Sequence, residues 1–412
     1  MPGAEDLYSD NSLASFWQPE VEVPPGVWAV AAESAANMLP DGPTILAHRG
    51  WTGLMEHILG EGQFGEQRLS LTPAKRLYYQ LKPFVPRRLT LVARRRYRAR
   101  QVHSFPLGWP IESRYVQFMH LALEHVLHQF GHGTANTFAP QTGSVLGCRA
   151  LWPDGARYAF VLTHDVEAGV GYNALRRLAD LDERYGFRAS FNFVPGDYPV
   201  EAALMSELNA RGFEVGVHGL KHDGRLFWSD AEFARQVTPI NSYLSKWEAV
   251  GFRAPYVHRH ARLMQALEIE YDTSYFDTDP FEPMSGGTMS IWPFLCGHFV
   301  ELPYTLAQDH TLLVLLGQRT PQLWLDKVDF IAKWGGMVLL NVHPDYMLEP
   351  GHWAVYEAFL AEMAQRRSGV QIDAEVPTGP SGATYWHAVP REVARWWRTR
   401  TRAEGNDSAL AN

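Results

Sequence analysis

The feature that most constrains the fold is a regular alternation of short apolar runs and amphipathic stretches that begins after residue 155. Apolar runs at 158–163, 189–194 and 213–217 are separated by stretches with helical spacing at 173–185 and 200–210. Further strand-like runs and helices are expected at 229–247, with a break at Pro239, and at 251–254, 268–275, 321–334 and 337–342. This repeated alternation of expected strands and helices predicts parallel strand pairing with right-handed crossovers, and therefore a barrel or a doubly wound sheet.

The first 150 residues follow a different pattern and predict a separate, mainly helical extension. A helix is expected after Glu112, and Pro83 and Pro86 should divide the basic stretch 71–101 into two short helices. The predicted organisation is an extension at 1–150, a catalytic domain at 151–368, and a C-terminal extension at 369–412 that packs on the catalytic domain.

Residues 75–100 carry ten Lys or Arg residues and no acidic one. Three interpretations stay open: a solvated helical face or domain contact, binding to anionic lipid headgroups or a lipid-linked sugar diphosphate, and nucleic acid. The net charge of the whole chain is -8, so no nucleic-acid partner is expected overall.

Two further observations concern the cellular compartment. The chain has only two cysteines, Cys148 and Cys296, which suggests neither a disulfide framework nor a cysteine zinc site. Its first residues are acidic, and no apolar run approaches the roughly 20 residues of a membrane-spanning helix. A cytoplasmic location is therefore predicted, and peripheral contact at the inner membrane face is one of the interpretations left open for residues 75–100.

Polar residues follow several of the apolar runs, at the strand ends where parallel α/β folds gather functional groups. Asp165 and Glu167 are two residues apart, so on an extended backbone both face the same side. One cation relieves their repulsion by taking one carboxylate as a ligand, which leaves the other to accept a proton. The alternative is a helix N-cap beside a surface acid.

Histidines follow two other strands. His218 and His222 are four residues apart and can bring two imidazoles to one ion, although a solvated or capping pair has the same spacing. His343 ends the run 337–342, where it is either a general acid or a buried histidine bonded to a backbone carbonyl. Together these residues predict a mononuclear metal hydrolase.

Other strand ends add charged candidates. Arg253 could pair with Asp165 and keep it ionised, or it could be a surface arginine beside a turn. Asp272, Asp277 and Asp279 form another acidic segment, in which at least one residue is expected to serve turn formation.

Read in order, these motifs resemble the five motifs of the polysaccharide deacetylases, carbohydrate esterase family four. The likeness spans roughly residues 155–365, and it rests on the following segments: Asp165 to Glu167, His218 to His222, Arg253 to Tyr256, Tyr271 to Ser274, and Leu340 to His343. The resemblance implies a distorted (β/α) barrel and a divalent metal, usually zinc, that serves removal of N-acetyl groups from amino sugars.

The resemblance also implies a role for each residue. Asp165 would be the general base and His343 the general acid, while Arg253 would orient the base. The metal ligands would be Glu167, His218 and His222, and the backbone N–H of Tyr256 would help hold the oxyanion. The sequence departs from the commoner pattern of two adjacent aspartates, because Val166 and then Glu167 follow Asp165. Metal identity is therefore left open.

The segments 301–310 and 385–390 resemble a branch of these proteins found with bacterial surface-polysaccharide synthesis. Glu301, Tyr304 and Asp309 would shape a sugar pocket there, together with the acidic segment at 272–279, or would form a packing motif that closes the barrel. The expected substrate is an amino sugar, lipid-linked or nucleotide-linked. Two alternatives are a cyclic imide or ureide amidohydrolase of the same fold and a non-catalytic carbohydrate-binding assembly protein.

Overall fold

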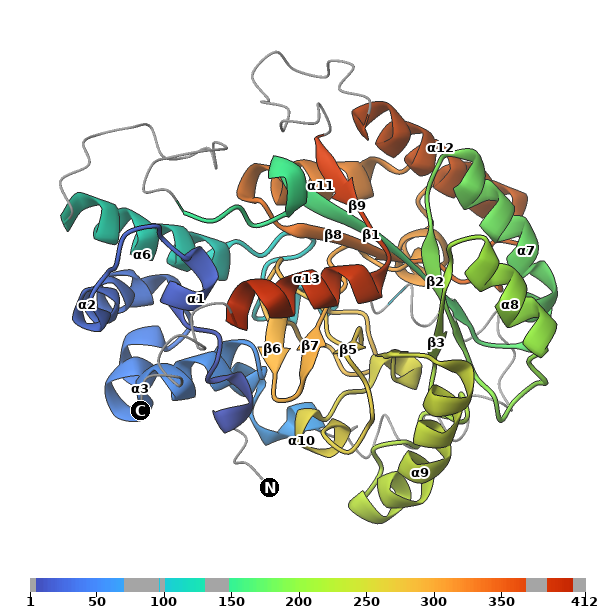
Figure 1. The fold of residues 1–412 in the computed structure, drawn as a ribbon, viewed down its shortest axis with the longest axis horizontal. Helices are drawn as coiled ribbons and strands as arrows, with labels where there is room; N and C mark the ends of the chain where they lie inside the picture. Colours follow the sequence, from blue (N-terminus) through green and yellow to red (C-terminus); the bar gives the residue numbers. More distant parts are fainter. Residues whose placement is uncertain (1–4, 70–95, 97–100, 130–147, 368–383, 403–412) are drawn as a thin grey trace.

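The computed structural model describes residues 5–69, 96, 101–129, 148–367 and 384–402. One sheet organises this part of the chain, with the strand order β6-β7-β5-β4-β3-β2-β1-β8 and with β9 also paired to β1 (Figure 1). The strands are β1 (Tyr158–Val166), β2 (Ala189–Phe193), β3 (Glu214–Val217), β4 (Gly251–Phe252), β5 (Tyr271–Asp272), β6 (Phe294–Cys296), β7 (Phe299–Glu301), β8 (Met337–Asn341) and β9 (Tyr385–His387).

The pairing within this sheet is parallel except in the hairpin of β6 and β7. Beyond β7, the backbone N–H groups of Thr305 and Leu306 both donate to the carbonyl of Leu339 in β8, at 3.1 Å. These bonds join the segment that follows β7 to β8, at the opposite edge of the sheet. The chain therefore forms a distorted (β/α) barrel, which confirms the expected fold.

Helices cover the outside of the barrel because each buries an apolar stripe against the strands. On α7, for example, Leu175, Leu178 and Leu181 are buried as the sequence pattern predicted. The helices of this region are α7 (Gly169–Arg184), α8 (Ala202–Ala210), α9 (Asp230–Trp247), α10 (Ala261–Met264), α11 (Gln322–Trp334) and α12 (Pro350–Arg367), with 3₁₀ turns at Pro153–Gly155 and Pro255–Val257 and a π-helix, η8, at His310–Leu315.

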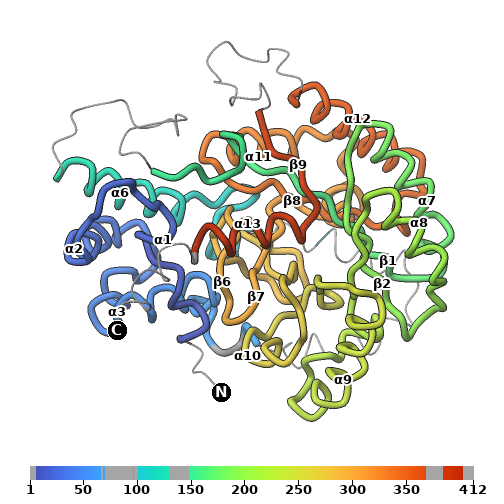
Figure 2. Tube along the Cα trace, viewed as in Figure 1, coloured from blue at the N-terminus to red at the C-terminus, as the bar shows by residue number. Residues whose placement is uncertain are grey.

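The described part of the N-terminal extension is helical, as expected. Its blue trace in Figure 2 gathers on one side of the molecule, next to β6. Aromatic packing joins it to the barrel, with the rings of Phe16 and Trp292 5.0 Å apart. Most of the basic segment 75–100 lies outside the described residues. The helices are α1 (Leu13–Trp17), α2 (Pro25–Ala35), α3 (Gly42–Ile58) and α6 (Arg114–Gln129), with 3₁₀ turns at Glu5–Tyr8, Ala36–Met38, Gly62–Phe64 (η3) and Glu66–Leu69.

The C-terminal extension contributes β9 and α13 (Pro390–Arg402), and α13 lies across the strands in Figure 1. Arg391 pairs with Glu214 at the start of β3, and Arg395 pairs with Glu270 just before β5. The helix therefore packs at the amino ends of these strands, opposite the end where functional groups are expected.

Two elements differ from expectation. Helix α9 continues through Pro239 without a break. Strand β5 is short because side chains take the backbone donors that would extend its ladder. Asp272 accepts the N–H of Ser274 at 2.8 Å, and Glu301 accepts the N–H of Tyr275 at 3.1 Å.

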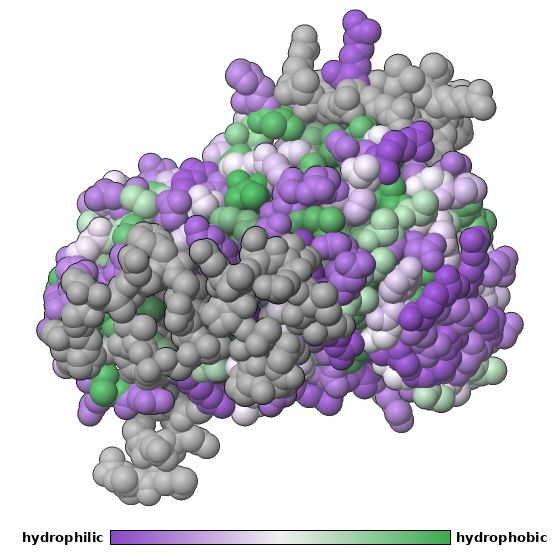
Figure 3. Space-filling view, turned by 90° about the horizontal axis from the view of Figure 1, so that it is seen from above, coloured by the Kyte–Doolittle hydropathy of each residue, from purple (hydrophilic) through white to green (hydrophobic). Residues whose placement is uncertain are grey.

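One face of the molecule has a mixed surface over its described residues (Figure 3). Hydrophobic residues are interspersed with hydrophilic ones on the face seen in Figure 3. In the described part of the chain, no helix combines the length and apolar character needed to cross a bilayer. The cytoplasmic location stays a prediction.

Candidate active site

The carboxyl ends of the strands surround a cavity of about 180 Å³. The parallel pairing of β1 and β2 places Asp165 beside Asn192 at the base of this cavity. The cavity is lined by Asp165, Glu167, His218, His222, Tyr256, Val257, Glu282, Pro283, Gln308, His310, His343 and Tyr346. Six of the seven residues predicted to be catalytic or metal-binding line this cavity. The seventh, Arg253, pairs with Asp165.

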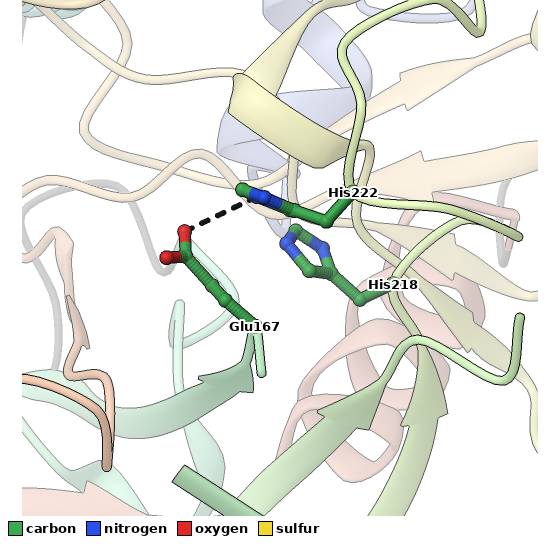
Figure 4. A group of neighbouring side chains, drawn as sticks. All are labelled: Glu167, His218 and His222. Atoms are coloured by element: carbon green, nitrogen blue, oxygen red, sulfur yellow. Dashed lines mark ion pairs between the residues drawn. The ribbon is translucent and has the colours of Figure 1, made fainter. Parts of the chain in front are cut away.

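Three side chains form a candidate metal centre. Glu167 follows β1, while His218 and His222 lie in the loop after β3, and Figure 4 shows the three converging. Their potential ligand atoms all lie within 4.8 Å of one another. Two imidazoles and one carboxylate match the donor set of catalytic zinc sites, which leave a further position open.

The surroundings of the two histidines fit this role. Nδ1 of His218 donates to the backbone carbonyl of Arg253 at 2.9 Å, which leaves Nε2 with its lone pair. Burial lowers the pKa of His218 to about 4, so its ring is neutral at physiological pH. Nε2 of His222 is buried 3.1 Å from Glu167 Oε1, yet forms no well-oriented hydrogen bond within the described residues. A buried nitrogen that faces a carboxylate without a well-oriented hydrogen bond fits a position where a metal ion would bind both groups.

Asp165 is buried and surrounded by donors. Its Oδ1 accepts from the amide of Asn192 at 2.9 Å, and its Oδ2 accepts from the amide of Asn341 at 2.9 Å and from Arg253 at 3.3 Å. Burial alone would raise the pKa of this carboxyl, but the charges of Arg253, His218 and His343 and the bond from Asn192 outweigh burial and lower it. Asp165 is therefore ionised and held in one orientation.

His343 lies two residues after the end of β8 and presents Nε2 to the cavity. That atom lies 3.9 Å from Asp165 Oδ2 and 3.6 Å from Glu167 Oε1. Its Nδ1 lies 2.6 Å from Oδ1 of buried Asp309. Burial alone would lower the pKa of His343, but the carboxylates of Asp309, Glu167 and Asp165 raise it to about 10. The ring is therefore an imidazolium at neutral pH and can donate a proton.

Tyr256 forms part of the cavity wall. Its ring stacks on His222 with centroids 4.5 Å apart, and its backbone adopts a φ of 59°. A positive φ in a bulky residue is uncommon and clusters at functional sites. The oxyanion role of its N–H stays a prediction.

Six residues were expected to shape a sugar pocket, and the structure places all six in the interior. Among the described residues that line the cavity, none of the six appears. Asp272 and Glu301 are paired in register on β5 and β7, and the Lys327 ammonium lies 2.7 Å from Asp277. The substrate role of these residues stays a prediction; they are Asp272, Asp277, Asp279, Glu301, Tyr304 and Asp309.

Sequence reasoning missed several residues that the structure brings to the site. Asn192 and Asn341 interrupt otherwise apolar strands, and this interruption is a signal that could have identified them. Tyr346 contacts Glu167 with O–O 3.4 Å apart, and Glu282 and His310 line the cavity from segments with no strand-end signal.

The chain is similar to known proteins in its three-dimensional structure. No family model matches the chain, and no curated protein does. Among solved structures, a protein classed as a polysaccharide deacetylase from Mycobacterium smegmatis is 18% identical with a TM-score of 0.45, covering 60% of this chain and 93% of its own. One from Pseudomonas aeruginosa is 17% identical with a TM-score of 0.47, covering 60% and 93%. The chain is similar to polysaccharide deacetylases.

An allantoinase also resembles the chain, at 15% identity and a TM-score of 0.47, with 60% of this chain and 92% of that one covered.

Proposed function

We propose that this chain is a metal-dependent hydrolase that removes an N-acetyl group from an amino sugar in polysaccharide or glycoconjugate biosynthesis. The main support for the proposal is that two candidate proton-transfer groups lie close together, beside three candidate metal ligands. Oδ2 of Asp165 lies 3.9 Å from Nε2 of His343, and both residues line the cavity that holds Glu167, His218 and His222.

Glu167, His218 and His222 would hold the metal, and the donor set favours Zn²⁺. When bound there, a divalent ion supplies Lewis-acid polarisation of the amide carbonyl and acidifies water. The backbone carbonyl of Arg253 fixes the His218 ring with Nε2 directed away from that bond. Glu167 is held in turn, because its backbone N–H donates to Asp345 at 3.2 Å.

The proton transfers fall to Asp165 and His343. Asp165 is ionised and accepts the proton of the attacking water as the new C–O bond forms. Arg253 and the amides of Asn192 and Asn341 hold that carboxylate in place. His343 then donates its Nε2 proton to the amide nitrogen, so that the C–N bond breaks and the products are acetate and a free amine.

The cavity wall supports a sugar as the substrate. The rings of Tyr256, Tyr346 and His310 line it together with the polar side chains of Glu282 and Gln308. Sugars offer both apolar ring faces, which pack on aromatic rings, and hydroxyl groups, which donate to carboxylate and amide oxygens. A lipid-linked or nucleotide-linked carrier is proposed from the sequence, and the basic segment expected to contact it lies largely outside the described residues.

Product analysis tests the proposal. The zinc-loaded chain is incubated separately with N-acetylated amino sugars and with cyclic imides and ureides. Release of acetate together with a free amine supports the proposal. Ring opening without acetate would replace it with the imide or ureide reaction, and bound metal without turnover on any of these compounds would favour a non-catalytic binding protein.

A further inference from the structure

One wall of the cavity belongs to residues 277–287, which we call the rim loop. Two of its residues, Glu282 and Pro283, line the cavity. The loop closes on itself through two backbone hydrogen bonds between Asp279 and Gly286, at 2.9 and 3.1 Å. At its tip, Glu282 accepts from the amide of Gln308 at 3.0 Å. The shape of the cavity therefore depends on what holds the rim loop.

The N-terminal extension holds it through Glu61, which precedes η3 and is 1% exposed. Its two carboxylate oxygens accept from Nε and Nη2 of Arg259, each at 2.5 Å. Oε1 of Glu61 also accepts the backbone N–H of Gly287 at 2.6 Å, and the amide of Gln63 donates to the carbonyl of Gly287 at 2.9 Å. A bidentate carboxylate–guanidinium pair is directional, so it fixes orientation as well as distance.

Arg259 extends this contact to two parts of the cavity wall. Its Nη1 donates to the carbonyls of Val257 at 3.2 Å and Met284 at 3.1 Å. Val257 lines the cavity, and Met284 follows Pro283 in the rim loop. The guanidinium also lies over the ring of Phe276, 4.2 Å from its centroid. Arg259 is 2% exposed, so its charge depends on Glu61 for compensation.

A second stretch of the extension contacts the same loop. The amide of Gln101 donates to the carbonyl of Pro280 at 3.3 Å, and the rings of Trp109 and Phe281 meet edge to face at 5.0 Å. The hydroxyl of Thr278 donates to the carbonyl of Gly108 at 2.7 Å. Segments 61–63 and 101–109 thus hold the rim loop from one end to the other.

Gly286 shows how closely the ion pair packs on the loop. A Cβ atom at this position would lie 2.3 Å from Oε1 of Glu61 and 2.6 Å from Nη2 of Arg259. Both side-chain ends are buried and engaged, so they have little freedom to move aside. The loop backbone and the ion pair therefore fit only with glycine at this position.

We propose that Glu61 is a positioning residue for substrate binding: through Arg259 and Gly287 it fixes the rim loop, so that Glu282 and Pro283 form a preorganised wall for the sugar. The substrate part of this inference rests on the proposed function. It gives the N-terminal extension a role in the active site, although its described residues contribute no side chain to the cavity lining.

The test compares Glu61→Gln with Glu33→Gln, the same chemical change at an exposed position of α2. Hydrogen exchange is followed by mass spectrometry in the full-length, zinc-loaded chain. We expect amides of the rim loop to exchange about tenfold faster in Glu61→Gln, with peptides from β1, β3 and β8 unchanged. Unchanged rim-loop exchange, or equal acceleration in every peptide, would overturn the positioning role.

Steady-state kinetics on an N-acetylated sugar tests the substrate part. Loss of preorganisation should raise KM by about tenfold in Glu61→Gln while kcat stays within about twofold, because the proton-transfer groups are untouched. A merely structural role would instead lower kcat in proportion to the folded fraction and leave KM unchanged, which would contradict the inference. Glu33→Gln should match the wild type in both constants.

Gly286→Ala provides a variant that alters no charge and should reproduce both changes. It also keeps the test decisive if Glu61→Gln does not fold. If the wild-type chain releases no acetate from any acyl sugar, the proposed function and the substrate part fail together, while the exchange result still decides whether Glu61 fixes the rim loop.

Discussion

Asp309 holds His343 by two hydrogen bonds: its Oδ1 lies 2.6 Å from Nδ1 of the ring, and its Oδ2 accepts the backbone N–H of His343 at 2.8 Å. Asp309 is fully buried, and it caps η8, the π-helix that begins at His310. One carboxylate therefore fixes both the position of the proposed general acid and the proton on its inner nitrogen.

The first prediction concerns Asp309→Asn and pH. The active form of His343 is the imidazolium, so activity should fall as pH rises through its pKa, which the surrounding carboxylates raise. Removing the nearest carboxylate should move the alkaline limb of the kcat profile about one to three units toward lower pH. The profile is measured for acetate release, with Asp326→Asn on the exposed face of α11 as the control. An unmoved alkaline limb would contradict the role of Asp309.

The second prediction concerns metal binding. A ligand that binds only the folded chain stabilises it, by about 2.7 kcal/mol at a concentration one hundred times the Kd. Zinc should therefore raise the Tm of the wild-type chain, and chelation should reverse the rise. His218→Ala should abolish the shift because it removes one of three protein ligands. His298 lies outside the cluster, where its ring contacts Gln265 and the carbonyl of Leu267. The control variant His298→Ala should therefore keep the zinc-induced rise in Tm.

Much of this site was predictable from sequence because its residues follow strands directly. Parallel pairing brings strand ends together, so Asp165, His218 and His343 could be expected to meet. Asp309 could not be placed the same way. It comes from an irregular segment, 34 residues before His343, and whether its side chain faces the cavity or the back of the histidine depends on how η8 packs.

The rim loop shows a second limit of sequence reasoning. Glu61 and Arg259 are separated by 198 positions, and neither belongs to a periodic pattern. Their pairing is a tertiary contact between the extension and the catalytic domain. Likewise, a strand was expected over 268–275, but β5 is shorter because buried carboxylates accept the backbone N–H groups that would extend it.

The third prediction concerns stability and pH. Asp272 and Glu301 are fully buried neighbours on β5 and β7, and burial, then their mutual interaction, raises the pKa of Glu301. Burial also raises the pKa of Asp272. A carboxyl whose pKa is higher in the folded state binds its proton more tightly there. Its contribution to stability is therefore present below the unfolded pKa and is lost as pH rises toward the folded value.

Glu301→Gln should remove part of this dependence. At pH 4 the variant and the wild type should unfold with similar free energies, because Glu301 is mostly protonated in both the folded and the unfolded state. As pH rises, the variant should become relatively more stable, by up to about 1.4 kcal/mol per pH unit within the titration window. Urea unfolding at pH 4, 6 and 8 measures this, with Glu33→Gln as the control. A constant difference at all three pH values would contradict the claim that the folded state raises the pKa of Glu301.

The central claim is that Asp165 and His343 transfer protons beside a metal held by Glu167, His218 and His222. The most direct measurement is acetate release by Asp165→Asn, with bound zinc determined in the same preparation. Asparagine keeps the size of the side chain but is not a base, so zinc should stay bound while turnover falls by about 10²- to 10⁴-fold. Near-normal turnover by Asp165→Asn with zinc bound would contradict the claim.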